Sequence, residues 1–313
     1  KSLCHSLGRP LRSDFVQFEF LTGVHFGIGM LNETANTFQA DQLFSALYIE
    51  ALKMQMEEEF LDAVRSGRLL FSDAFPYMGQ QYFVPKPMVY VEPVKKGVSE
   101  QKKAYKKLKF LPIDKMDDFL EGTLDPTEID MKDFGKFQQE TQAAVRREKE
   151  DTLPYRVGVF YFGEKSGLYI LTAWEQEEDK QLLEELLESL SYTGIGGKKF
   201  SGLGKFNCIP KKVPEQFMKQ LEKKAGRYML LSPALPRDEE LEEALSGASY
   251  QLEKRSGFVA SPEYAPEWRR KKDLYVFQAG SCFEKKFEGD IYDVSDGGNH
   301  SVYRYAKPLF MRI

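Results

Sequence analysis

Residues 179–206 read DKQLLEELLESLSYTGIGGKKFSGLGKF and combine a helix signature with a dense run of glycine. In the first half, leucines recur at the three- and four-residue spacing that places them on one helix face, with glutamates on the other. The second half holds five glycines in the eleven residues from Gly194 to Gly204. Glycine lets a backbone turn sharply and approach another backbone closely. We therefore predict an amphipathic helix over 179–192 that leads into a glycine-rich loop. The leucines are Leu182, Leu183, Leu186, Leu187 and Leu190, and the glutamates are Glu184, Glu185 and Glu188.

The same loop carries cations and donors that suit a phosphate chain. Lys198, Lys199 and Lys205 supply positive charge, and the turning glycine backbone supplies N–H groups. Phe200 and Phe206 add flat rings on which unpaired bases could stack. The loop fails the residue count of both GxxxxGK[ST] and GxGxxG, and it follows a helix where those nucleotide-binding loops open one. We therefore favour a nucleic-acid strand over a free nucleotide, with an ordinary surface loop as the alternative.

The distribution of charge indicates a local attraction to nucleic acid rather than a global one. The chain of 313 residues has a formal net charge of −4, so it is not basic overall. Lysine nevertheless gathers in 95–109, with seven lysines against one glutamate, and in 194–212, with five lysines and no acid. The stretch 300–313 carries two arginines and one lysine, again without an acid. Such clusters set the field over a groove, although solvated surface lysine is the plain alternative for 95–109.

The beginning of the chain predicts a strand, a long loop and a helix. Residues 14–21 alternate apolar and polar side chains, which indicates a half-buried strand. A glycine-punctuated loop follows over 23–37. An apolar stripe at helical spacing then predicts a helix that ends near residue 66, with Asn36 and Gln39 as a capping pair. The stripe consists of Leu43, Phe44, Leu47, Tyr48, Ala51 and Leu52.

The rest of the chain predicts further strands and one charged insertion. Residues 68–93 read as short strands broken by prolines. Residues 95–150 are highly charged and poor in β-branched residues, so we expect an arm with partial helix that projects from the first domain. Strands at 155–162 and 167–174, joined by a short GEKSG turn, predict a hairpin. Further strands are expected at 228–232, 249–255, 274–278, 282–293 and 302–312, with a short helix at 238–245.

These elements predict an α+β fold with two domains. The first spans 13–150 and contains the insertion 95–150, the second spans 151–313, and residues 1–12 are treated as an extension. Three cysteines without a CxxC spacing favour a reducing, cytoplasmic location over a disulfide framework. No apolar run reaches the ~20 residues of a membrane span, so we expect no membrane contact.

Several stretches together resemble the RAMP superfamily of CRISPR-associated proteins. YTGIGGKKFSGLGKF at 192–206 is similar to the G-rich loop of that superfamily. HFGIGMLNETANTFQADQLFSALYIEALK at 25–53 resembles the first loop and helix of the type III-A (Csm) subunit that caps the 5′ end of the guide RNA. The matches cover most of 14–313 in the same order and are weakest over 95–150. The others are SDAFPYM and VPKP between 72 and 87, and the C-terminal stretches YQLEKRSGFVAS, DLYVFQAGSCF, FEGDIYDV and VYRYAKPLFMRI.

The resemblance implies a fold of two RRM-like (ferredoxin-like) domains with an inserted arm or thumb. It implies a non-catalytic subunit that binds the repeat-derived 5′ tag of the guide RNA (crRNA). The partners it implies are the large polymerase-like Csm subunit, which makes cyclic oligoadenylate, and the repeated backbone RAMP subunit. In the family the thumb kinks the RNA where tag meets guide, and we expect 95–150 to form part of it. No cofactor is expected.

Carried over residue by residue, the resemblance gives a set of candidate RNA-binding residues. Mixtures of cations, glycine turns and aromatic rings suit single-stranded RNA, because phosphate contacts position the strand and stacking reads the bases. The first loop supplies His25, Gly27 and Asn36. The glycine-rich loop supplies Gly194, Gly196, Gly197, Lys198, Lys199, Ser201, Gly202 and Lys205. The C-terminal part supplies Arg255 and Phe258, followed by Arg304, Tyr305 and Lys307.

Two other functions stay open at this point. Some relatives cut precursor RNA by acid–base attack of a 2′-hydroxyl, and His25 is the one credible candidate among the three histidines for a metal-independent endoribonuclease. A scaffold that contacts only protein is the other alternative. No carboxylates converge at a spacing that suits a metal nuclease, and no HExxH or Cys/His zinc spacing is present, so we expect no metal.

Overall fold

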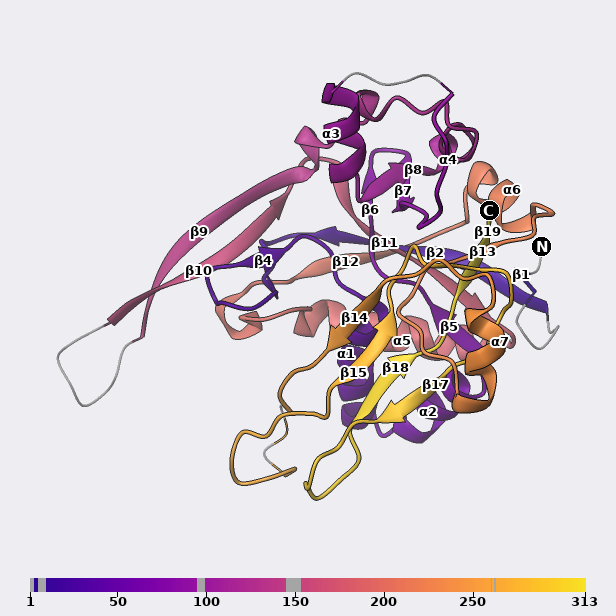
Figure 1. Ribbon diagram of the computed structural model, residues 1–313. Helices are drawn as coiled ribbons and strands as arrows, with labels where there is room; N and C mark the ends of the chain where they lie inside the picture. Colours follow the sequence, from indigo (N-terminus) through magenta and orange to yellow (C-terminus); the bar gives the residue numbers. More distant parts are fainter. Residues whose placement is uncertain (1–2, 5–9, 95–98, 145–152, 260, 262) are drawn as a thin grey trace.

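An eight-stranded antiparallel sheet forms the centre of the protein (Figure 1). The computed structural model describes residues 3–4, 10–94, 99–144, 153–259, 261 and 263–313. The sheet runs in the order β1–β2–β11–β6–β7–β8, while β12 also pairs with β2 and β5 with β11. Sheets and helices together confirm the predicted α+β class. The strands are β1 (Leu3–Cys4), β2 (Pro10–Phe20), β5 (Leu69–Phe71), β6 (Phe75–Met78), β7 (Gln81–Pro85), β8 (Phe110–Pro112), β11 (Ser166–Trp174) and β12 (Phe206–Lys211).

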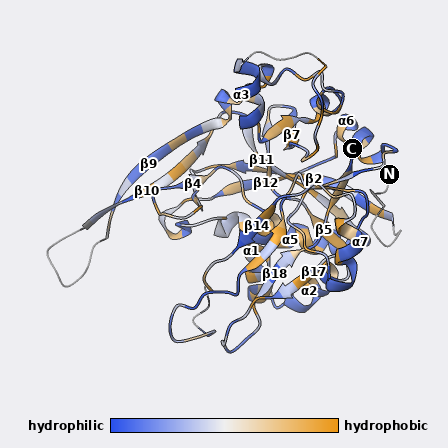
Figure 2. Ribbon diagram, in the orientation of Figure 1, coloured by the Kyte–Doolittle hydropathy of each residue, from blue (hydrophilic) through white to orange (hydrophobic). Residues whose placement is uncertain are grey.

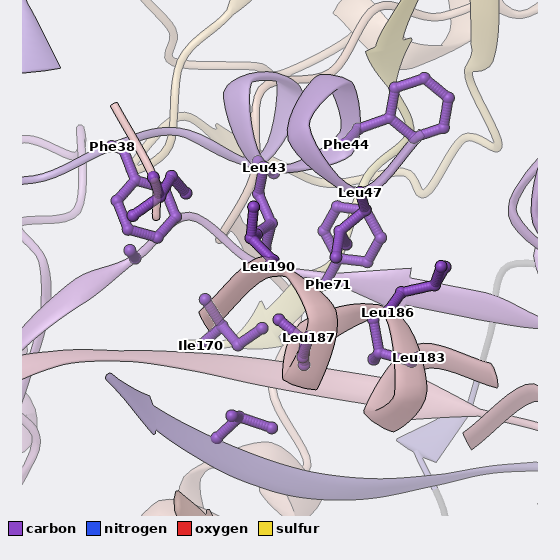
Figure 3. Packing of buried hydrophobic residues seen from close by; sticks show 14 of the residues in the cluster. Phe38, Leu43, Phe44, Leu47, Phe71, Ile170, Leu183, Leu186, Leu187 and Leu190 are labelled. Carbon is purple, nitrogen blue, oxygen red and sulfur yellow. The ribbon is translucent and has the colours of Figure 1, made fainter. Parts of the chain in front are cut away.

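Helices cover one face of this sheet. They are α1 (Ala40–Met54), α2 (Glu57–Arg65) and α5 (Glu177–Thr193), whose apolar residues share one core with alternate residues of β2 and β11. Figure 3 shows Leu190 of α5 beside Leu43 of α1, and Leu187 near Ile170 of β11. The leucine stripe predicted for 179–192 is confirmed, since all five of its leucines are buried. Their burial fixes α5, and therefore the position at which the glycine-rich loop begins.

The helix predicted to run to residue 66 is two helices. Gln55 takes a left-handed backbone with φ of 59°, which ends α1, and α2 begins at Glu57. The N-cap of α1 is Gln39, whose N–H donates to Gln42 Oε1 at 2.9 Å, so the expected pairing with Asn36 is wrong. The cap lies three residues later than predicted, because the loop before α1 stays extended through Phe38 and Gln39.

The first predicted strand is buried on both faces of the sheet. Phe18 belongs to the core under the helices, whereas Phe15 belongs to a second core on the opposite face. Gln17, expected on a polar face, is also buried and donates to the Tyr82 hydroxyl at 2.7 Å. The strand starts at Pro10 and Leu11 is buried, so residues 10–12 are part of the sheet rather than of an extension. The remainder of that extension, 1–2 and 5–9, lies outside the described residues.

The predicted hairpin of 155–162 with 167–174 does not form. β10 (Leu153–Phe162) pairs with β9 (Gly135–Ala144) over ten residue pairs, while β11 pairs with β2, β5 and β6. Both edges of β11 are already paired, one with β2 and the other with β5 and β6, so β11 stays within the central sheet. The boundary that we set at residue 150 therefore separates β9 from its partner β10, and β2 from its partners β11 and β12.

The ribbon β9–β10 is the arm, and it projects from the body in Figure 1. Figure 2 shows β9 as largely hydrophilic along its length, whereas β10 is hydrophobic near the body. The arm predicted for 95–150 is therefore only partly correct. Residues 110–134 lie in the body, since Leu111 and Phe119 are buried in the second core. Residues 95–98 and 145–152 lie outside the described part. The body segment contains β8 and α4 (Met116–Leu120), and α3 (Ser99–Lys107) precedes it.

The C-terminal part forms small antiparallel sheets that pack against the central one. Asp73 donates its N–H to the carbonyl of Leu231 at 2.8 Å, which links the β5–β6 connection to the strand that follows α6 (Glu215–Glu222). No described helix is long and apolar enough to cross a membrane. The sheets are β16–β13–β19, β14–β15 and β17–β18. Their strands are β13 (Tyr228–Leu230), β14 (Leu252–Arg255), β15 (Leu274–Phe277), β16 (Cys282–Phe283), β17 (Asp290–Asp293), β18 (Tyr303–Ala306) and β19 (Phe310–Arg312).

Candidate nucleic-acid interface

The first loop, the glycine-rich loop and β10 of the arm meet in one place, which we call the loop junction (residues 22–37 and 194–205, with 155–160). Gly197 donates its N–H to the carbonyl of His25 at 2.8 Å, and Gly204 donates to the carbonyl of Gly23 at 2.9 Å. Val24 and Phe160 exchange both backbone hydrogen bonds at 2.9 Å. Segments that are about 170 residues apart in the chain are therefore joined backbone to backbone.

Glycine is required in the second loop because backbone lies directly against it, from the first loop at Gly196 and from the same loop at Gly204. A Cβ on Gly196 would stand 2.7 Å from the His25 carbonyl oxygen, and one on Gly204 would stand 2.0 Å from the Ile195 carbonyl oxygen. Both glycines also have positive φ, at 94° and 78°. The close approach that the glycines predicted is present, but its partner is protein backbone.

Many N–H groups of the glycine-rich loop are not free to bind phosphate. This corrects the expectation that the loop leaves them uncovered. The loop folds on itself and on the first loop, which satisfies these donors within the chain. The occupied donors are the backbone N–H groups of Gly194, Ile195, Gly197, Ser201, Gly202, Gly204 and Lys205.

The lysines of the loop are held at the surface by neighbouring polar groups. Lys198 Nζ lies 4.6 Å from the centre of the Tyr155 ring and 3.4 Å from its hydroxyl, so it faces β10 of the arm. Lys205 Nζ donates to the carbonyl of Tyr192. Burial lowers the pKa of Lys199, and the charge of Lys53 lowers it further. An anion bound beside Lys199 would stabilise its charged form, because the anion offsets both the burial and the repulsion by Lys53.

The two aromatic residues predicted as stacking planes differ in their exposure to solvent. Phe200 is fully exposed, so its ring is available for stacking. Phe206 is buried in the core between Phe18 and Phe20, which removes it from the candidate interface. Ser201 and Gly202, beside Phe200, are exposed as expected.

His25 is buried at the bottom of the loop junction. Its Nδ1 lies 2.7 Å from the carbonyl oxygen of Gly158, and because a carbonyl only accepts, Nδ1 carries the proton. The ring thus ties the first loop to β10. Gly27 is exposed and Asn36 half-buried, so both stay in the candidate interface.

The cations predicted in the C-terminal part are used inside the protein. Arg255 donates two hydrogen bonds of 2.8 Å to the carboxylate of Asp41, and Arg304 donates a third at 2.6 Å. Burial opposes ionisation of Asp41, but the charges and hydrogen bonds of the two arginines outweigh it and hold its pKa below 3.8. We therefore remove Arg255 and Arg304 from the candidate interface. Asp41 lies more than 200 residues from either arginine, and no sequence pattern links them.

Tyr305 and Lys307 are also interior residues. The Tyr305 ring is fully buried and its hydroxyl lies 3.2 Å from the carbonyl oxygen of Phe71. Lys307 is buried and its Nζ donates to the carbonyl of Arg65 at 2.9 Å. These contacts attach the C-terminal strands to α2 and β5, so both residues leave the candidate interface. Phe258, in contrast, is half-exposed.

A neighbouring groove limits the extent of the interface. It has a volume of about 890 Å³ and lies between α5 and β12, with Lys205 on its border. Glu19, Glu184 and Glu188 line it, and the two glutamates of α5 also raise the pKa of Cys208 there, after burial, to about 12. Such a groove repels a phosphate chain, so the interface does not continue in that direction.

Sequence reasoning missed some exposed apolar and aromatic residues. Ile28 and Met30 at the tip of the first loop are exposed apolar side chains, as is Phe137 on β9. Trp268 is 82% exposed and begins the sequence WRRKK, a basic run with an aromatic residue that is the usual sign of a nucleic-acid contact. This basic run is the sequence signal from which Trp268 could have been predicted as a contact.

Comparison with known proteins identifies the family to which the chain belongs. Residues 40–207 match the family model of the RAMP superfamily, and residues 223–313 match that of the CRISPR Csm4 C-terminal domain. A protein of Mycobacterium tuberculosis named CRISPR system Cms protein Csm4 is 41% identical over 305 residues, which cover 97% of this chain and 98% of that protein. A protein of the same name from Streptococcus thermophilus is 37% identical, over 92% of this chain and 95% of that protein. The chain therefore belongs to the RAMP superfamily, and within it to the Csm4 family.

Solved structures support the fold. The Csm3–Csm4 subcomplex of the type III-A CRISPR-Cas interference complex contains a chain with a TM-score of 0.64 at 17% identity, covering 96% of this chain and 99% of that one. A chain of the Csm1–Csm4 cassette in complex with AMPPNP has a TM-score of 0.62 at 19% identity. The match covers 96% of this chain and 98% of that one. The identified class agrees with the resemblance inferred from the glycine-rich loop.

Proposed function

We propose that this chain is a non-catalytic subunit of a type III-A CRISPR complex that holds the 5′ tag of the crRNA at the loop junction. The observation that carries the proposal is the union of the two loops beside β10 of the arm, where Lys198, Lys199 and exposed Phe200 are presented together. A strand lying there meets cations for its phosphates and a ring for a base. The arm β9–β10 is the thumb in this proposal.

The partners and domains belong to the same proposal. Structures similar to this chain come from assemblies with Csm3 or with Csm1. The proposed partners are therefore the repeated backbone subunit and the large polymerase-like subunit. The first RRM-like domain runs from β2 to β12 with the arm inserted, since the strand order β12–β2–β11–β6 and the two helical segments suit a β-α-β-β-α-β unit. The second begins near residue 223, and the complex works in the cytoplasm.

Replacing Lys198 and Lys199 with alanine is expected to weaken binding of tag RNA and to reduce its salt dependence. If both side chains contact phosphate, the slope of log K against log salt becomes less negative by up to about 1.4 for single-stranded RNA. Fluorescence anisotropy with labelled tag RNA at several salt concentrations measures both changes.

The matched control is the double alanine variant of Lys211 and Lys212, which are exposed at the far end of β12 and carry the same charge. It should bind like the unmodified chain. Equal loss in both double variants would mean that only the net charge matters, and the assignment to the loop junction would be wrong.

Incubation of the purified chain with repeat RNA in EDTA is expected to leave the RNA intact. The buried His25 ring, bonded to Gly158, is out of reach of a 2′-hydroxyl. Denaturing gels of end-labelled RNA provide the measurement. Cleavage at a defined site by the unmodified chain, abolished in His25→Ala, would instead establish the endoribonuclease. A chain that binds no RNA at all would favour the protein-only scaffold.

A further inference from the structure

An exposed aromatic and basic surface follows β14, which we call the aromatic platform (Phe258, Trp268, Arg269 and Arg270). The Trp268 and Phe258 rings meet edge to face with centres 6.0 Å apart, and the Arg270 guanidinium lies 5.9 Å from the centre of the Phe258 ring. Trp268 is 82% exposed and Phe258 53% exposed. Large rings that stay in solvent at one place indicate a binding surface.

The platform has a defined backbone. Phe258 and Arg270 form a bridge, Val259 donates its N–H to the carbonyl of Arg269 at 2.9 Å, and Lys271 donates to the carbonyl of Gly257 at 2.8 Å. Both sides of the loop are thus paired as in a hairpin. The rings are therefore presented by paired backbone, which lowers the entropy that binding has to overcome.

The charge of the platform selects an anionic occupant. Arg269 and Arg270 are exposed, and neither forms an ion pair with a described carboxylate. Burial lowers the pKa of Lys271, and Arg304 lowers it further, so the adjacent interior is positive as well. Glu267 is the exposed acid next to Trp268. Two exposed arginines beside two exposed rings fit phosphate and base together.

Short contacts join β14, which precedes the platform, to the start of α1, which follows the first loop. Gln39, directly after the first loop, donates from Nε2 to Glu253 on β14 at 2.6 Å. Arg255, at the end of β14, holds Asp41 in the first turn of α1. In Figure 1 the loop after β14 extends from the body on the same side as the arm. These contacts fix β14, which leads into the platform, against the segment that follows the first loop.

We propose that the aromatic platform is a second RNA contact, which stacks unpaired bases on Trp268 and Phe258 and binds the adjoining phosphates through Arg269 and Arg270. This inference rests on the proposed function to the extent that the chain binds single-stranded RNA. It adds a site in the C-terminal part, away from the two loops.

Tryptophan fluorescence tests the proposal directly. The chain has two tryptophans, and Trp174 is buried, so the signal of Trp268 is obtained as the difference between the unmodified chain and Trp268→Phe. The full chain is titrated with a single-stranded RNA of the tag sequence extended into the guide, and with the same strand in a duplex. We expect the single strand, but not the duplex, to quench Trp268 and to protect it from acrylamide.

Affinity separates this site from the loop junction. Trp268→Ala is expected to weaken binding of the extended single strand about ten-fold, while Trp268→Phe retains most of the affinity because phenylalanine still stacks. Arg269→Ala with Arg270→Ala should flatten the salt dependence. If Trp268 is unaffected by RNA while the Lys198 and Lys199 variant loses binding, the platform is not an RNA site but the proposed function stands.

Two other results would overturn the inference. If RNA neither quenches Trp268 nor binds the unmodified chain, the proposed function fails together with it. If Trp268 becomes protected only when a Csm1- or Csm3-type partner is added without RNA, the platform is a protein contact.

Discussion

Asp41→Ala is expected to lower the free energy of unfolding by about 3 to 5 kcal/mol, because it leaves Arg304 buried without its ion-pair partner and leaves Arg255 with Glu253 alone. The carboxylate of Asp41 is fully buried between them and accepts three hydrogen bonds. It connects α1 to the ends of β14 and β18, so its removal also loosens the C-terminal part from the helices. Urea unfolding followed by circular dichroism measures the change.

The control is Asp117→Ala, which breaks an exposed pair with Lys223 and should cost no more than about 1 kcal/mol. The pH dependence provides a second readout. The pKa of Asp41 in the folded chain lies below 3.8, so its contribution is fully present above that pH and is lost as the pH falls through the folded value. Asp41→Ala should therefore differ most from the unmodified chain above pH 4. A difference below 1 kcal/mol at neutral pH would show that the arginines find other partners.

Gly196→Val is expected to lower the free energy of unfolding by about 3 kcal/mol or more and to abolish binding of tag RNA. The new side chain meets the His25 carbonyl and the Phe26 ring, and it also forces valine into a backbone with φ of 94°. The glycine-rich loop then moves away from the first loop, and the hydrogen bond between Gly197 and His25 is lost. Thermal unfolding and RNA anisotropy on the same preparation measure both effects.

Gly202→Val is the matched control for that substitution. Gly202 has a similar φ of 86°, but nothing lies within 4 Å of a Cβ placed there. It isolates backbone strain, for which we expect a cost of about 1 to 2 kcal/mol. If both valine variants lose the same stability, strain alone explains the glycines and the contact between the two loops is not what requires them.

The local elements could be predicted from the sequence because their signals are local. The leucine spacing of 179–192 and the glycines that follow gave α5 and its loop, and the close approach of backbones was correctly expected. The residue against which Gly196 packs could not be named, since His25 is about 170 residues away. Periodicity reports which face is buried and says nothing of the partner.

The errors arose where an interaction joins distant parts of the chain. A short turn between Phe162 and Ser166 suggested a hairpin, but pairing along both edges places β11 inside the central sheet. Arg255 and Arg304 carry charge that the sequence shows as available, whereas the fold neutralises it with Asp41. An isolated chain segment does not reveal which cations are already paired.

The route of the chain through the central sheet has a consequence for synthesis on the ribosome. Phe18 of β2 pairs with Leu168 on one side and Cys208 on the other, so both neighbours are translated long after it. At about 5 to 20 residues per second, the strand waits on the order of 10 to 40 s for its second neighbour. During that interval the core side chains of β2, such as Phe15 and Phe18, are exposed in the nascent polypeptide, so we expect chaperones to bind this stretch during synthesis.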